Sequence, residues 1–215
     1  MLKNLLNYLK MKLKVCGLSR LKEVETCVSN YVDFCGFILN YPKSHRFIPF
    51  NKAKQLTNVP KKKSSYVGVL VNPNEQELSI FSKLRLDYFQ LYGNYSNQDL
   101  IRIRKKFKKK IIFSIQVKKR EDAEKYKSIK NGADIILWDS SGYAESLSWD
   151  FNWIKDVSIN RQKMIAGNIK LSELNNLINL TDIVDVSGAL ETNKVKDIKK
   201  IKKFIKVIKK INYEN

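Results

Sequence analysis

The chain has 215 residues, 43% of which are hydrophobic, and a formal net charge of +20. This composition argues against a disordered chain, and no apolar run approaches the roughly 20 residues that a membrane-spanning helix needs. The charge alone suggests a nucleic-acid-binding protein, but only seven of the 41 basic residues are arginine, and the lysines are spread over almost every expected helix. We therefore interpret the charge as a solvated surface that steers anionic substrates, and we expect neither a specific nucleic acid nor a membrane as partner.

Cysteine and histidine are too few to predict a metal site. The three cysteines, Cys16, Cys27 and Cys35, form no CxxC pair, and His45 is the single histidine. An odd number of cysteines without a secretory signal indicates a reducing, cytoplasmic location. Residues 1–10 lack the apolar core and cleavage site of a signal peptide, so we expect them to form a short N-terminal extension before one domain of residues 11–215.

From Met11 onward, short apolar runs alternate with amphipathic runs, and the alternation repeats eight times. The apolar runs are rich in Val, Ile, Phe and Tyr and are bounded by polar residues or glycine, which is typical of buried parallel strands. The expected strands are LKVCGL (13–18), DFCGFIL (33–39), SYVGVLV (65–71), YFQLYG (88–93), KIIFSIQV (110–117), DIILWDS (134–140), KMIAGNI (163–169) and DIVDVSG (182–188).

The segments between the strands have the apolar spacing of helices. In 20–31 and in 197–210, apolar residues recur at intervals of three and four, which predicts one buried face. Cys27 lies on the first of these faces and Cys35 inside the second strand, so both are expected in the core. The residues expected to cap the helices after strands three, four and seven are Asn74, Asn97 and Ser172.

Eight strand–helix units fit either a closed barrel or an open doubly wound sheet. An open sheet would carry a glycine-rich dinucleotide turn after its first strand, whereas this turn reads CGLSR (16–20). The even spacing and the count of eight favour a single (β/α)8 TIM barrel. The connection SGYAESLSW (141–149) is longer than its neighbours and is expected to be a mobile loop.

In such barrels the active site is built at the carboxyl ends of the strands. These ends supply a thiol that can act as a base, a carboxyl that can act as an acid and an arginine that can hold an anion. The last two strands add small residues whose backbone N–H groups can approach a phosphate. The strand-end residues are Cys16, Gly17, the segment 41–46 that ends in Arg46, Asn72, Gln90, Asp139, Gly167, Asn168, Ser187 and Gly188.

Seven motifs of the chain are similar to those of a known family. They are KVCGLSR (14–20), GFILNYPKSHRFI (36–48), VGVLVN (67–72), FQLYG (89–93), ILWDSSG (136–142), MIAGNI (164–169) and DVSGALET (185–192). In this order and spacing the sequence resembles phosphoribosylanthranilate isomerase of tryptophan biosynthesis, from Met11 to near its end.

The resemblance implies an Amadori rearrangement of N-(5-phosphoribosyl)anthranilate to 1-(2-carboxyphenylamino)-1-deoxyribulose 5-phosphate, without metal or organic cofactor. The sequence leaves a monomer and a homodimer equally open. It implies that Asp139 is the general acid that protonates the ring oxygen and that Cys16 is the general base that removes the C2 proton. Arg46 would pair with the anthranilate carboxylate. Backbone groups around Gly167, Asn168, Ser187 and Gly188 would hold the phosphate.

Chemistry sets conditions on these roles. The acid must keep its proton near neutral pH, which burial beside Leu137 and Trp138 favours. The base must ionise, which burial opposes, so a cation or oriented N–H groups must lie beside Cys16, and the sequence does not identify them. Asp185 is interpreted as a brace of the eighth strand and His45 as a solvated loop residue.

The chain departs from the family pattern around the phosphate and the loop after strand six. AESLSWDF (144–151) replaces a glycine-rich stretch, Gly167–Asn168 replaces a double glycine, and DVSGALE (185–191) has lost one hydroxyl. Tyr92 stands where the family has histidine. Two alternatives therefore stay open: a related barrel isomerase acting on another phosphorylated aminosugar, and a basic nucleic-acid-binding barrel.

Overall fold

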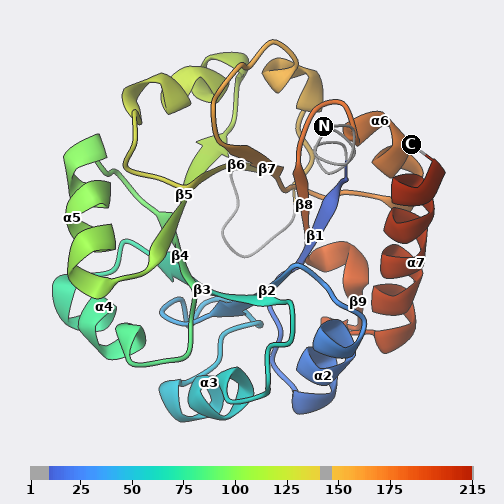
Figure 1. The fold of residues 1–215 in the computed structure, drawn as a ribbon, viewed down its shortest axis with the longest axis horizontal. Helices are drawn as coiled ribbons and strands as arrows, with labels where there is room; N and C mark the ends of the chain where they lie inside the picture. Colours follow the sequence, from blue (N-terminus) through green and yellow to red (C-terminus); the bar gives the residue numbers. More distant parts are fainter. Residues whose placement is uncertain (1–9, 141–146, 215) are drawn as a thin grey trace, which may run out of the picture.

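The computed structural model describes residues 10–140 and 147–214. Eight parallel strands form a closed barrel in chain order, and Lys12–Val15 pairs with Ile183–Val186 to complete it (Figure 1). The strands are β1 Lys12–Val15, β2 Phe34–Ile38, β3 Ser65–Val71, β4 Tyr88–Tyr92, β5 Lys110–Val117, β6 Ile135–Ser140, β7 Gln162–Ile165 and β8 Ile183–Val186. The expected (β/α)8 barrel and all eight expected strands are confirmed.

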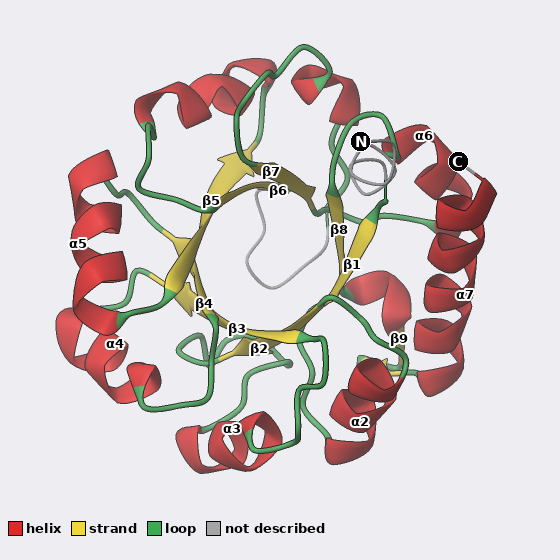
Figure 2. Ribbon diagram, viewed as in Figure 1, coloured by secondary structure: helices red, strands yellow, loops and turns green. Residues whose placement is uncertain are grey.

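Helices surround the barrel on its outer face (Figure 2). The α-helices are α2 Leu21–Ser29, α3 Phe50–Thr57, α4 Glu75–Ser82, α5 Asn97–Phe107, α6 Leu174–Leu177 and α7 Ile198–Glu214. The connections after β5 to β8 contain the 3-10 helices η1 Arg120–Ser128, η2 Phe151–Ile154, η3 Leu171–Glu173 and η4 Gly188–Leu190, and η4 is followed by a hairpin of β9 Glu191–Thr192 and β10 Val195–Lys196. No helix of the described residues has the length and apolar character to cross a membrane.

Two of the three expected helix caps are wrong. Asn74 caps α4, because its side chain accepts a hydrogen bond from the Glu77 N–H. Ser96, not Asn97, caps α5, and the Asn97 amide oxygen instead accepts from the Asn131 and Gly132 N–H groups at 3.0 and 2.8 Å. Ser172 lies inside η3 and caps no helix. An N-cap depends on which side chain can reach a free backbone N–H, and Asn97 is engaged in a long-range contact.

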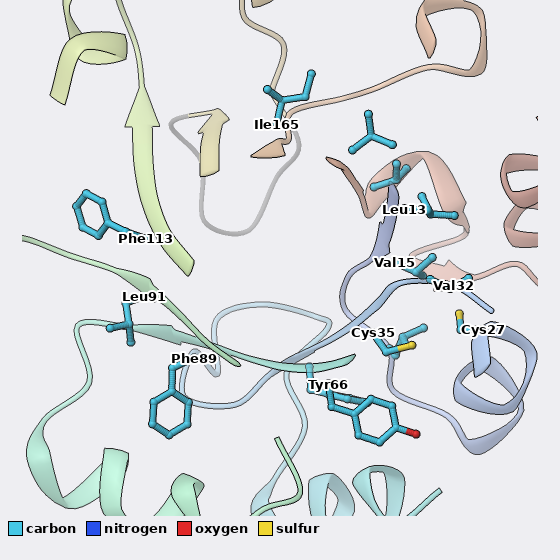
Figure 3. Close-up of a cluster of buried hydrophobic side chains, with 14 of the residues drawn as sticks. Leu13, Val15, Cys27, Val32, Cys35, Tyr66, Phe89, Leu91, Phe113 and Ile165 are labelled. Carbon is cyan, nitrogen blue, oxygen red and sulfur yellow. The ribbon is translucent and has the colours of Figure 1, made fainter. Parts of the chain in front are cut away.

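The main hydrophobic core fills the space between the barrel and its helices (Figure 3). Cys27 and Cys35 are fully buried there, as expected. Inside the barrel, apolar side chains such as Phe34, Leu137 and Met164 pack in a separate cluster. The barrel interior is therefore a packed core, and in barrels of this kind the active site lies at the carboxyl-terminal mouth. The expected mobile loop falls mostly on residues 141–146, and the N-terminal extension on residues 1–9, which lie outside the described residues.

Candidate active site

One pocket at the carboxyl ends of the strands brings the sequence-predicted site residues together. Its lining includes the predicted acid, base and arginine and the four predicted phosphate-binding residues: Cys16, Arg46, Asp139, Gly167, Asn168, Ser187 and Gly188. These residues come from four separate strand ends, those of β1, β6, β7 and β8, and from the loop after β2. The geometry therefore supports a single site in which a small anionic molecule would meet all of them.

Cys16 directly follows β1 and lies above a buried ion pair. Lys14 Nζ bonds to Asp185 Oδ2 at 2.6 Å, and both side chains are almost fully buried inside the barrel. Burial raises the pKa of the Cys16 thiol, and the positive charge of Lys14 opposes that rise. Lys14 is thus the cation whose position the sequence did not identify. Asp185, which was expected only to brace the eighth strand, is also the charge partner of Lys14.

Asp139 lies near the end of β6 and accepts hydrogen bonds on both carboxylate oxygens. The Tyr92 hydroxyl donates to Oδ2 at 2.5 Å, and the Ser140 N–H donates to Oδ1 at 2.8 Å. Burial raises the pKa of Asp139 to about 6, and the Tyr92 hydrogen bond works against this rise. A carboxyl with such a pKa keeps part of its protons near neutral pH, as a general acid requires.

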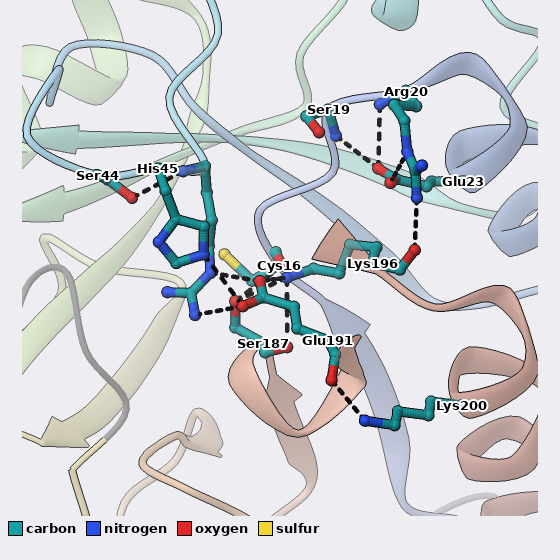
Figure 4. Close-up of polar contacts among 11 residues, drawn as sticks. Cys16, Ser19, Arg20, Glu23, Ser44, His45, Ser187, Glu191, Lys196 and Lys200 are labelled. Atoms are coloured by element: carbon teal, nitrogen blue, oxygen red, sulfur yellow. Dashed lines mark hydrogen bonds and ion pairs between the residues drawn. The ribbon is translucent and has the colours of Figure 1, made fainter. Parts of the chain in front are cut away.

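Arg46 lies at the mouth of the pocket and is held by Glu191. Arg46 Nε and Nη2 donate to the two Glu191 oxygens at 2.6 and 3.0 Å, and Lys196 pairs with the same carboxylate (Figure 4). The Glu191 carboxyl pKa is lowered to about 2, because the hydrogen bond and charge of Arg46 and the charge of Lys196 outweigh burial. Two cations and one anion leave a net positive charge beside the pocket. His45, exposed as expected, contacts Glu191 at 3.1 Å.

The same cluster is hydrogen-bonded through Ser187 to the backbone of Cys16. Lys196 Nζ donates to Ser187 Oγ at 3.2 Å, and Ser187 Oγ in turn donates to the Cys16 carbonyl at 3.0 Å (Figure 4). The loop that carries Glu191 is therefore tied directly to the end of β1. The orientation of Arg46 and the position of Cys16 depend on one connected network.

The turn after β7, which lines the pocket, has two consecutive residues with positive φ. Gly167 has φ +112° and Asn168 has φ +46°, and asparagine tolerates this left-handed conformation better than most residues other than glycine. Trp149 Nε1 donates to the Ala166 carbonyl at 2.7 Å, and Asn168 Nδ2 donates to Ser148 Oγ at 2.9 Å. The altered loop after β6 thus packs against the β7 turn.

Sequence reasoning missed three charged residues of this site: Lys14, Glu191 and Lys196. Lys14 was detectable in principle, because a lysine two residues before Cys16 in a buried strand points to the same face as the thiol. Glu191 and Lys196 carried no such signal, since they lie in the β9–β10 hairpin after β8.

Comparison with known proteins agrees with this geometry. The family model of N-(5′-phosphoribosyl)anthranilate isomerase matches residues 13–207. The N-(5′-phosphoribosyl)anthranilate isomerase of Streptococcus mutans is 32% identical over 159 residues, covering 74% of this chain and 77% of that protein. That of Thermoanaerobacter pseudethanolicus is 32% identical over 162 residues, again covering 74% of this chain and 77% of that protein.

Solved structures extend the likeness to the fold. The Thermotoga maritima phosphoribosylanthranilate isomerase, described as dimeric and studied as monomers, is 26% identical with a TM-score of 0.77, covering 93% of this chain and 99% of that one. A structure of the isomerase in complex with reduced 1-(o-carboxyphenylamino)-1-deoxyribulose 5-phosphate is 25% identical, with the same TM-score and coverage.

Proposed function

The chain belongs to the N-(5′-phosphoribosyl)anthranilate isomerase family and is an isomerase of tryptophan biosynthesis, and from this premise we propose which of its residues carry out the rearrangement. The substrate is N-(5′-phosphoribosyl)anthranilate, and the product is the corresponding 1-amino-1-deoxyketose phosphate. The observation that supports the assignment is that one pocket is lined by Cys16, Arg46 and Asp139.

Asp139 acts as the general acid. Its carboxyl proton passes to the furanose ring oxygen, the C1–O bond breaks, and the nitrogen lone pair forms the C1=N bond of a Schiff base. A carboxyl with a pKa of about 6 has protonated molecules available at neutral pH, and its ionised form is held by Tyr92 and the Ser140 N–H. This step leaves Asp139 as a carboxylate.

Cys16 acts as the general base. Its thiolate removes the proton from C2 of the Schiff base, the C–H electrons form the C1=C2 bond, and the C=N electrons return to nitrogen. The resulting enol-amine becomes the ketone when C1 gains a proton and the C2 hydroxyl loses one. The Lys14 ammonium stabilises the thiolate against the cost of burial.

Arg46 positions the aromatic ring by pairing with the anthranilate carboxylate. Its guanidinium is already fixed in one plane by two bonds to Glu191, so it loses little rotational freedom on binding. Backbone groups of Gly167, Asn168, Ser187 and Gly188 hold the phosphate on the other side of the pocket. The surplus positive charge of the Arg46–Glu191–Lys196 cluster favours a substrate that carries two anionic groups, a phosphate and a carboxylate.

Four further points, on domain extent, oligomeric state, location and nucleic acid, complete the proposal. We propose a single catalytic domain from residue 11 onward, acting as a monomer or a homodimer in the cytoplasm, without specific binding of nucleic acid. The Thermotoga maritima relative is described as dimeric, which supports a test of oligomeric state by light scattering. Sequence-selective binding of DNA or RNA that persists at high salt would contradict the last point, because the non-specific binding of a basic protein weakens steeply as salt concentration rises.

Turnover of freshly prepared substrate, followed by the loss of its fluorescence, tests the function. We expect the wild type to be active and Cys16→Ser and Asp139→Asn each to lose about 10²–10⁴ in kcat. Cys27→Ala, which removes a buried thiol outside the pocket, should keep its activity. An inactive wild type would overturn the function, and a fully active Cys16→Ser or Asp139→Asn would overturn that residue's role.

A further inference from the structure

Three side chains form a continuous hydrogen-bonded chain that ends at Asp139. Gln90 Nε2 donates to the Tyr92 hydroxyl oxygen at 3.1 Å, and the Tyr92 hydroxyl donates to Asp139 Oδ2 at 2.5 Å. Gln90 and Tyr92 are two residues apart on β4, so both point into the barrel. Gln90 is 1% exposed and Tyr92 is 7% exposed, so bulk water does not compete for these bonds.

This arrangement fits the ionised form of Asp139. A carboxylate only accepts hydrogen bonds, and Oδ1 and Oδ2 accept from Ser140 and Tyr92 respectively. A protonated Asp139, by contrast, has an O–H group to donate. If its proton is on Oδ2, the Tyr92 oxygen must become the acceptor, and the Tyr92 O–H must then turn to another acceptor.

The acceptor that this second arrangement needs is present in the barrel. Gln90 Oε1 is buried and has no hydrogen-bond partner among the described residues. A half-turn of the Gln90 amide exchanges its oxygen and nitrogen, which brings Oε1 to the position 3.1 Å from the Tyr92 oxygen. The chain then runs in the reverse direction, from Asp139 through Tyr92 to Gln90.

We infer that Tyr92 is a positioning residue, and that with the Gln90 amide it forms a reversible hydrogen-bond chain that holds Asp139 in both its ionised and its protonated form. The inference rests on the proposed role of Asp139 as general acid. Tyr92 carries one proton in each arrangement, so the chain changes direction without releasing or storing a proton. Burial raises the pKa of the Tyr92 hydroxyl well above its usual range, so it stays a neutral donor.

Other charged groups face the same carboxyl. Asp185 from β8 and Lys14 from β1 act on Asp139 in opposite directions, and Cys16 lies beside Tyr92. Because Lys14 and Asp185 pair with each other, their effects on Asp139 partly cancel. The Tyr92 hydrogen bond is therefore the contact whose removal changes the Asp139 environment most directly.

Two variants test the chain by opposite effects on one group. In Tyr92→Phe both forms of Asp139 lose a bond, but the bond to the charged carboxylate is the stronger, so the pKa of Asp139 should rise by about one pH unit. In Gln90→Met both forms lose a bond between Gln90 and Tyr92. The protonated form is then left with a buried Tyr92 O–H that has no acceptor, whereas the ionised form loses only a donor to a phenol lone pair, so the pKa of Asp139 should fall. Tyr66→Phe is the control. It removes a buried phenol that donates to the Val59 carbonyl outside the pocket, so the pKa of Asp139 should stay unchanged.

The measurement is the carboxyl titration of Asp139, followed by NMR of protein labelled with ¹³C at the aspartate carboxyl and assigned by its loss in Asp139→Asn. Circular dichroism confirms that each variant is folded. An unchanged or lowered pKa in Tyr92→Phe would overturn the positioning role, and a raised pKa in Gln90→Met would overturn the reversal of the chain.

The pH dependence of kcat/KM separates this inference from the proposed function. If the limb of the pH profile that is assigned to Asp139 moves together with the NMR pKa in Tyr92→Phe, the hydrogen-bond chain and the role of Asp139 as general acid are both supported. If the NMR pKa rises but no limb of the profile moves, the hydrogen-bond chain is supported and the role of Asp139 as general acid is overturned. Rescue of the wild-type pKa by Tyr92→His, which restores a buried donor, would further support the positioning role.

Discussion

Lys14 Nζ and Cys16 Sγ converge on the space left by the absent side chain of Gly36. A Cβ built on Gly36 would lie 2.9 Å from the sulfur and 3.2 Å from the ammonium nitrogen. The ammonium therefore lies close to the thiol in a buried site, where a charge acts more strongly than in water. Lys14 also bonds to Asp185, so this cation serves both the stability of the barrel and the ionisation of the proposed base.

Lys14→Met should separate these two effects. Loss of the ammonium leaves Asp185 buried without its partner, which should destabilise the fold by about 3–5 kcal/mol. It should also raise the pKa of the Cys16 thiol further and slow both turnover and alkylation of Cys16 by iodoacetamide. The modified cysteine is identified by mass spectrometry.

The matched control is the double variant Lys14→Met with Asp185→Asn. Removing both charges should restore much of the lost stability. Alkylation should stay slower than in the wild type, because Lys14 acts more strongly on the thiol pKa than Asp185 does, and Lys196, the other cation that acts on it, is paired with Glu191. An alkylation rate for Lys14→Met that matches the wild type across pH would refute the role of Lys14.

Gly36→Ala should impair catalysis more than it impairs folding. The added methyl group would come within 3.2 Å of the Cys16 Cα and of Lys14 Nζ and within 2.9 Å of the sulfur, so the arrangement of the thiol and the ammonium must change. We expect kcat to fall by about tenfold or more, since a small displacement of a reacting group is costly. Gly68→Ala is the control, because its methyl group would meet Leu86 and Leu39 at 2.8 and 2.9 Å, away from the pocket lining. Equal kcat in the two variants would contradict this expectation.

The pH dependence of kcat/KM should have an unusual form. The acid, Asp139, has a pKa of about 6, whereas burial raises the pKa of the base, Cys16. The working form needs Asp139 protonated and Cys16 ionised. Below pH 6 the thiolate fraction grows with pH while Asp139 stays protonated, so kcat/KM rises. Between the two pKa values the gain in thiolate and the loss of protonated Asp139 cancel, and kcat/KM is level before it falls at high pH.

The rising limb near pH 6 therefore belongs to the acid and not to the base. The substrate phosphate also ionises near this pH. Tyr92→Phe distinguishes the two, because it should move an Asp139 limb to higher pH and cannot move the pKa of the substrate. A limb that stays fixed in this variant belongs to the substrate.

The barrel was predictable because each strand is a continuous apolar run, and the predicted acid, base and arginine could be placed because strand ends meet at one mouth. What the sequence could not show were the partners of these residues. Lys14 and Asp185 lie 171 residues apart, and Arg46 and Glu191 lie 145 residues apart. No local pattern links such pairs, since only barrel closure brings their strand ends together. The sequence showed that Tyr92 replaces the histidine of the family. It could not show the bond from Tyr92 to Asp139, because the spacing of apolar residues does not give the position of a side-chain hydroxyl.

Arg46→Lys should affect substrate binding more than the chemical steps. Lysine keeps the charge but has no planar fork, so it cannot make the two bonds to Glu191 that fix the orientation of Arg46. We expect KM to rise by about tenfold or more, with a smaller change in kcat. His45→Gln is the control, because His45 contacts the same Glu191 carboxylate from an exposed position. Steady-state kinetics with the substrate check both variants. A fall in kcat at constant KM would instead assign Arg46 to the proton-transfer steps, since an interaction made only in the transition state changes kcat alone.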